Sequence, residues 1–107
     1  MGRESRYRRA EAVAAMMDLK WTNKALSDLA RLYDFLAPVN KQAAGKIIQT
    51  LVAAPMSLKE HPHIGETLDE FQPREVRRIL VGHYEIRYEI QEPTIYVLRI
   101  WHTREDR

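Results

Sequence analysis

The chain has 107 residues, of which 45% are hydrophobic and 30% charged, a composition typical of one soluble domain with a modest core. It contains no cysteine, which excludes a disulfide framework and thiolate chemistry. No apolar run is long enough to span a bilayer, and the N-terminus lacks the hydrophobic stretch of a secretory signal. We therefore expect a cytoplasmic protein without membrane contact.

The excess positive charge is confined to the N-terminus. Residues 1–16 hold four arginines and two glutamates, whereas residues 17–107 hold 13 basic and 13 acidic residues. This balance weighs against sequence-independent nucleic-acid binding by the body of the chain, because such binding needs several uncompensated cations. We divide the chain into a basic extension, residues 1–16, and one domain, residues 17–107. We interpret the extension as a non-native segment from an over-long start assignment; a basic arm that forms a helix on a partner is the alternative.

The first predicted elements are a strand and a helix. Residues 17–22 alternate apolar and polar side chains, which predicts a short strand. Thr22 or Asn23 caps the helix that follows, and Pro38 ends it. Asp28 falls on its exposed side. The predicted apolar face of this helix consists of Leu26, Leu29, Tyr33 and Leu36.

A second helix begins after Asn40, whose side chain can cap it. Pro55 kinks or ends this helix. The short connection between the two helices predicts an antiparallel helical hairpin. The apolar stripe of the second helix consists of Ala44, Ile47, Ile48, Leu51 and Val52.

The C-terminal half predicts a long loop at 61–73 and then three strands, separated by turns at Gly82-His83 and Glu92-Pro93. In the middle strand, tyrosines and isoleucines alternate with charged residues from Glu85 to Glu89, which predicts one wet face. The strand from Thr94 to Trp101 is almost continuously apolar, as expected of a central strand. The predicted fold is α+β, in the order β-α-α-β-β-β, with an antiparallel sheet and a helical hairpin packed on one face.

Four motifs in this order resemble the RelE/ParE superfamily of bacterial toxins, and the resemblance covers residues 17–107. The first two are W-T-x-x-A at Trp21, Thr22 and Ala25, and P-x-x-G at Pro62 and Gly65. The more specific two are R-x-x-x-x-x-x-Y-x-I-x-Y at Arg77, Tyr84, Ile86 and Tyr88, and I-x-H-x-R-x-D at Ile100, His102, Arg104 and Asp106.

The resemblance implies the toxin of a type II toxin–antitoxin, or plasmid-stabilisation, module that a cognate antitoxin neutralises. The superfamily divides into gyrase poisons and ribosome-dependent mRNA endonucleases, and the ending LRIWHTRED is similar to that of the ParE-like gyrase poisons. Seven arginines meet six carboxylates in residues 74–107, so this region offers little free positive charge to RNA. We therefore predict a non-enzymatic inhibitor of DNA gyrase, present as a homodimer or as a toxin–antitoxin hetero-oligomer.

The first alternative is a ribosome-dependent mRNA endonuclease, with ribosome and mRNA as partners. Metal-free RNA cleavage needs a base, cations that stabilise the phosphorane-like transition state, and an acid for the leaving oxygen. The candidates for these roles are Arg78, His102 and Arg104. Alternatively, these residues have no catalytic role: His102 and Arg104 are exposed polar residues after the last strand, and the arginines of the strands are paired with carboxylates. The second alternative is an inactive relative that only binds its antitoxin.

We expect no cofactor and no metal. The two histidines of His61-Pro62-His63 have no cysteine or carboxylate at ligand spacing, and paired loop histidines are more often solvated.

Overall fold

The computed structural model describes residues 17–105. The predicted extension, residues 1–16, and the tail residues Asp106 and Arg107 lie outside the described residues. In chain order the elements are β1 (Asp18–Trp21), α2 (Asn23–Leu36), α3 (Lys41–Ala53), the 3-10 helix η1 (Ala54–Lys59), β2 (Glu66–Thr67), the 3-10 helix η2 (Asp69–Phe71), β3 (Val76–Val81), β4 (Tyr84–Gln91) and β5 (Thr94–His102).

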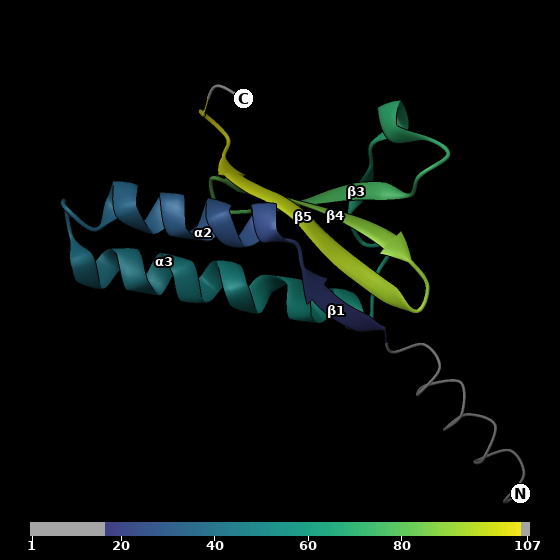
Figure 1. Ribbon diagram of the computed structural model, residues 1–107, viewed down its shortest axis with the longest axis horizontal. Coiled ribbons are helices and arrows are strands. Elements are labelled where there is room, and N and C mark those ends of the chain that lie inside the picture. Colours follow the sequence, from purple (N-terminus) through teal and green to yellow (C-terminus); the bar gives the residue numbers. More distant parts are fainter. Residues whose placement is uncertain (1–16, 106–107) are drawn as a thin grey trace, which may run out of the picture.

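The sheet has the strand order β1-β5-β4-β3-β2, and α2 and α3 form an antiparallel hairpin beside and beneath it (Figure 1). This confirms the α+β class and the predicted β-α-α-β-β-β order of β1, α2, α3, β3, β4 and β5, to which the two-residue strand β2 is added. Strands β2 to β5 are antiparallel, but β1 pairs with β5 in parallel, so the sheet is mixed rather than wholly antiparallel. Hairpin turns force an antiparallel course on β3, β4 and β5, whereas β1 reaches β5 from the far end of the chain and no turn constrains its direction.

Side-chain caps begin both helices, and of the two candidates for the first helix the cap is Thr22. The Thr22 hydroxyl accepts the Ala25 N–H at 3.1 Å, and the Asn40 side chain accepts the Ala43 N–H at 2.9 Å. Gly82 has φ of +59° in the two-residue turn between β3 and β4, a conformation that glycine adopts without steric cost.

The buried face of α2 differs from the predicted one. Leu26 is 50% exposed, whereas Asp28, predicted to lie outside, is only 4% exposed. The buried positions are Ala25, Asp28, Leu29 and Leu32. This set has the same helical spacing as the predicted face but is rotated by about one residue, and it places a carboxylate inside, which requires strong hydrogen-bonding partners.

The loop 61–73 is less irregular than predicted, because it contains β2 and η2. A buried tyrosine holds its first part: the Tyr88 hydroxyl donates to the Pro62 carbonyl at 2.7 Å and accepts the Gly65 N–H at 3.0 Å. The Arg77 guanidinium donates to the carbonyl of Gly65 at 2.7 Å. Burial raises the pKa of Tyr88, so its hydroxyl keeps the proton that it donates.

Gly65 must remain glycine for this contact. A Cβ at Gly65 would lie 2.5 Å from the Tyr88 hydroxyl oxygen and 2.7 Å from the Arg78 carbonyl oxygen. We expect Gly65→Ala to lower the free energy of unfolding by about 1–3 kcal/mol, measured by urea titration. Gly45→Ala is the matched control: its Cβ would meet nothing within 4 Å, and alanine in a helix should raise stability by about 0.5–1 kcal/mol. Equal stability of the Gly65 variant and the wild type would contradict the tyrosine contact.

Candidate functional site

Asp28 joins α2 to the edge of β5. Its carboxylate accepts the Ile100 backbone N–H at 2.8 Å, the Arg99 Nε–H at 2.8 Å and an Arg31 Nη–H at 3.2 Å. Strand β1 pairs with β5 only as far as Val97, so the Ile100 N–H lies beyond β1 and Asp28 supplies its acceptor. Burial by itself would raise the pKa of Asp28, but the hydrogen bonds from Arg99, Ile100 and Arg31 outweigh burial, and the pKa lies below its usual value.

Thr22 fixes the other end of the same edge. Its hydroxyl lies 2.9 Å from the Val97 carbonyl and 3.1 Å from the Leu98 carbonyl, and donates to this pair. These two carbonyls lie where the register of β5 against β4 shifts at a bulge between Arg87 and Tyr88. The start of α2 is therefore held to the irregular part of β5, and α2 continues along the strand to its C-terminal end.

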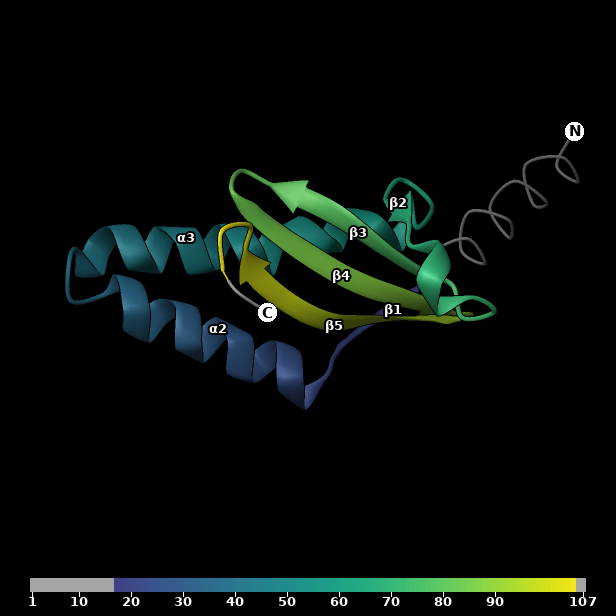
Figure 2. The ribbon, with the colours of Figure 1, turned by 90° about the horizontal axis from the view of Figure 1, so that it is seen from above.

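The face of the sheet away from α3 carries a row of arginines. Arg78 on β3 lies opposite Arg87 on β4, which lies opposite Arg99 on β5. Figure 2 shows β3 and β4 crossing in front of α3. Like charges in directly opposed positions repel, so this row needs compensating groups.

Carboxylates neutralise each member of the row. Arg99 binds Asp28, and the guanidinium of Arg87 lies 3.4 Å from Glu85. Arg78 contacts Glu85 at 3.2 Å and Glu66 at 3.2 Å. Nearby, Arg74 binds Glu89 at 2.8 Å, and this hydrogen bond lowers the pKa of Glu89. The arginine row is thus a balanced ionic layer rather than a free cationic surface.

Two aromatic rings complete this layer. The Trp101 ring lies 4.8 Å from the Arg87 guanidinium carbon and 5.2 Å from that of Arg99. The Phe71 ring lies 5.1 Å from Arg87 and 5.8 Å from Arg74. Such stacking orders the guanidinium groups and shields the carboxylates between them from water.

The prediction that one face of β4 is exposed to solvent is therefore wrong in part. Glu85 is 1% exposed and Glu89 is 6% exposed, because the arginines and rings cover them. Arg99, the one charged residue within the largely apolar strand β5, is paired with the Asp28 carboxylate of α2. Arg87 pairs with Glu85 of its own strand, whereas its cross-strand neighbours are arginines.

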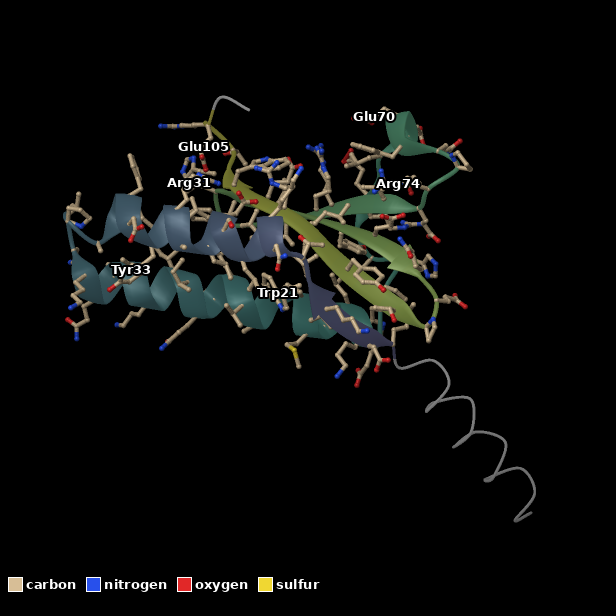
Figure 3. The ribbon with its side chains drawn as sticks, viewed as in Figure 1. Trp21, Arg31, Tyr33, Glu70, Arg74 and Glu105 are labelled. Atoms are coloured by element: carbon tan, nitrogen blue, oxygen red, sulfur yellow. The ribbon has the colours of Figure 1, made fainter. Side chains whose placement is uncertain are left out.

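A hollow of about 440 Å³ lies between the C-terminal half of α2 and the end of β5. Its lining residues are Arg31, Leu32, Phe35, Leu36, Tyr84, His102, Arg104 and Glu105. We call it the terminal hollow. Figure 3 shows Arg31 and Glu105 lying side by side here, far from Arg74, and the two side chains form an ion pair. The Glu105 carboxylate also accepts the His102 backbone N–H at 2.7 Å, so it closes the end of β5.

The structure brings two of the three candidate catalytic residues together. His102 accepts the Arg104 backbone N–H on Nδ1 at 3.1 Å, and its ring meets the Tyr84 ring edge-on with centroids 5.1 Å apart. Tyr84 lies opposite His102 and packs against the core beneath the sheet, so both belong to the helix-covered face. Burial, and then the charge of Glu105, raise the pKa of Tyr84, which makes its hydroxyl a poorer acid.

Arg78 does not join them. The β3 residue opposite Tyr84 is Val81, and Arg78 lies three residues further along the strand. An odd separation places the two on opposite faces, and three residues span about 10 Å. One phosphate cannot contact Arg78 and His102 together.

A second concave surface runs along the other side of the hairpin. It comprises two adjoining hollows of about 600 and 350 Å³, which share Thr50 and Val81. We call it the α3–β3 groove. Its lining residues are Lys46, Ile47, Thr50, Leu51, Ala53, Ala54, Ser57, Ile64, Ile79, Val81, Gly82, His83 and Tyr84. Strand β2 pairs with β3 only at Arg77 and Arg78, so in the part of the chain that the structure describes no strand pairs with the outer edge of β3 at 79–81.

Within residues 17–105, no His, Cys, Asp and Glu side chains form a group of three or more that could hold a metal ion. Among the same residues, no helix has the length and apolar character needed to cross a membrane.

Comparison with known proteins decides the family. The sequence model described as ParE toxin of type II toxin-antitoxin system, parDE, matches residues 19–107. The chain belongs to this ParE toxin family. The ParE-family chain is also 32% identical over 87 residues to Toxin RelE2 of Caulobacter vibrioides, covering 81% of this chain and 96% of that protein.

Solved structures agree with the family. The chain resembles a chain of the chromosomal ParDE system from P. aeruginosa with a TM-score of 0.69 and 27% identity, over 82% of this chain and 97% of that one. It shares the fold of a chain from the RelBE2 toxin–antitoxin complex of Mycobacterium tuberculosis, with a TM-score of 0.55 and 18% identity, over 80% of this chain and 90% of that one. The ParE-family chain is thus a type II toxin of the RelE/ParE superfamily.

Sequence reasoning missed three residues that shape the site: Asp28, Phe35 and Arg31. Asp28 had a usable signal, because it stands between Ala25 and Leu32 at the spacing of a buried stripe. Phe35 lies outside the predicted apolar face, and an exposed aromatic residue near the end of a helix is itself a signal of a contact surface.

The buried carboxylate of Asp28 should make stability pH-dependent. Its folded pKa lies below the unfolded value, so its contribution is present above about pH 4 and is lost as the pH falls through the folded pKa. We expect Asp28→Asn to lower the free energy of unfolding by about 2 kcal/mol at pH 7, less than for a fully buried pair because the Arg99 side chain is 40% exposed. Urea titrations from pH 7 to pH 3 should show this deficit shrinking on acidification. Asp34→Asn, an exposed carboxylate on the same helix, is the control. A deficit that stays constant with pH would contradict the assignment.

Proposed function

We propose that this toxin acts in the cytoplasm, as part of a plasmid-stabilising or chromosomal toxin–antitoxin module, by binding DNA gyrase rather than by cutting RNA. The observation that carries the proposal is the balanced ionic layer on the open face of the sheet. Each arginine of the row contacts at least one carboxylate, so the row offers RNA phosphates no uncompensated cation. A surface whose charges are balanced suits a protein partner better than a nucleic acid, because charged residues are depleted at the centres of protein interfaces.

Gyrase is the candidate target because the ending of the chain is similar to that of ParE-like gyrase poisons and because the ParE family model matches residues 19–107. The proposed mechanism is binding without catalysis, so the affinity for gyrase limits the toxic effect.

The α3–β3 groove supports the second partner, a cognate antitoxin. It offers an apolar channel beside the outer strand edge at 79–81, and Ile64, which lines this channel, is 69% exposed. An extended segment can add to such an edge, or an amphipathic helix can lie in the channel. The relatives from P. aeruginosa and M. tuberculosis come from toxin–antitoxin systems, which supports the same arrangement here, whether the complete assembly contains one toxin or a toxin dimer.

The second candidate function is ribosome-dependent mRNA cleavage. The terminal hollow favours it, because His102, Arg104, Arg31 and Tyr84 line one concavity. His102 Nδ1 accepts a hydrogen bond, which leaves Nε2 for proton transfer, and Arg104 could stabilise the phosphorane-like transition state. Arg78 lies on the opposite face and has no part in this version. An inactive relative that only binds its antitoxin is the third candidate.

Induced expression of the chain separates these candidates. Gyrase inhibition should produce a DNA-damage response and filamentous cells, and the purified protein should inhibit supercoiling by gyrase. Ribosomal cleavage should produce translation arrest and cut transcripts, and His102→Ala should lower the cleavage rate by about 10²–10⁴-fold. Co-expression of the antitoxin should abolish either effect. Cut transcripts together with normal supercoiling activity would refute the gyrase proposal, and neither response would indicate the inactive relative.

A further inference from the structure

Among the described residues, the terminal hollow combines an exposed phenyl ring, Phe35, with an arginine, Arg104, that has no carboxylate partner. Resting on the proposed function, we propose that it binds a segment of the protein target, which places an apolar side chain against Phe35 and a carboxylate on Arg104. These two contacts would hold the target protein at the terminal hollow, on a different surface from the one proposed for the antitoxin.

The apolar part of the site comes from α2. Phe35 is 78% exposed although the neighbouring Leu32 is buried. Leu36, which is partly exposed, completes the apolar wall of the hollow. A folded chain gains nothing from leaving a phenyl ring in water, whereas a partner that covers the ring gains apolar burial. Aromatic residues in this situation are typical anchors of protein interfaces.

The charge of the hollow defines the polar part. Arg31 is already bound by Asp28 and Glu105, and Glu105 is also held by the backbone of His102. Arg104 is exposed, and in residues 17–105 its guanidinium contacts no carboxylate. This guanidinium and the phenyl ring line the same hollow, and a partner carboxylate is the complement of the guanidinium.

This combination fits a polypeptide better than RNA. A nucleic acid presents a phosphate at each nucleotide and gains affinity from several unpaired cations. Of the two arginines that line the hollow, Arg31 is already paired, and only Arg104 has no carboxylate partner within residues 17–105. The hollow shares only Tyr84 with the α3–β3 groove proposed for the antitoxin. Substitutions in the hollow should therefore act on target binding without acting on antitoxin binding.

The test uses the purified full chain and the purified gyrase holoenzyme, with binding measured by biolayer interferometry and inhibition by a supercoiling assay. We expect Phe35→Ala and Arg104→Glu each to weaken gyrase binding by roughly 10- to 100-fold. Arg104→Lys should retain most of the affinity, because it keeps the charge. Val39→Ala and Lys41→Glu are matched controls, since both residues are exposed near the hairpin tip and outside the hollow. All variants should keep wild-type thermal unfolding and antitoxin affinity.

The outcomes separate the two proposals. Gyrase binding by the wild type with undiminished binding by Phe35→Ala and Arg104→Glu overturns this inference and leaves the proposed function standing. Failure of the wild type to bind gyrase overturns the proposed function and this inference with it. Loss of ribosome-dependent transcript cleavage in Arg104→Glu, with gyrase unaffected, makes the hollow a nucleic-acid site. Loss of self-association in Phe35→Ala, without a change in gyrase binding, makes it a dimer contact and also overturns the inference.

Discussion

The arrangement of this toxin depends on the Asp28 carboxylate at the edge of β5. Strand β1 covers only the first half of that edge, and past Val97 the hydrogen-bonding acceptor comes from α2. A buried carboxylate is costly unless several donors surround it, and here a backbone N–H and two guanidinium groups do so. The same contact fixes Arg99 in the ionic layer and Arg31 in the terminal hollow. One side chain thus positions both surfaces on which the functional argument rests.

The ionic layer bears on the choice between protein binding and RNA cleavage. A count of charges shows only that acids and bases balance, and balanced residues can still separate into a positive and a negative face. The structure describes a closer balance, in which Glu85 is buried between Arg78 and Arg87 and aromatic rings stack on the guanidinium groups. Those arginines already have partners, so an RNA phosphate would have to displace carboxylates to reach them. The cost of displacing these carboxylates favours a polypeptide partner over RNA.

The sequence was sufficient for the class of fold, the element order, both helix caps and the tight turn at Gly82, because each follows from local chemistry or periodicity. It was insufficient where a long-range contact overrides a local preference. Asp28 is polar and therefore looked exposed, but partners more than 70 residues away in the sequence make its burial favourable. Glu85 and Glu89 alternate with apolar residues and therefore looked exposed, but Arg78 pairs with Glu85 and Arg74 pairs with Glu89 from other parts of the chain. Strand direction at β1 had no local signal at all.

The candidate catalytic residues illustrate the same point at the level of function. Residue type alone made Arg78, His102 and Arg104 equivalent candidates for RNA chemistry. The alternation of side chains within one strand does not show which residues of different strands share a face of the sheet. Register does: it puts Arg78 in the ionic layer and His102 beside Tyr84 beneath the sheet. The two sheet edges are also unequal. Asp28 and Thr22 occupy the edge of β5, whereas the edge of β3 at 79–81 has no strand partner within residues 17–105. An added strand would therefore pair at β3 rather than at β5, and the terminal hollow, between α2 and the end of β5, is a separate surface.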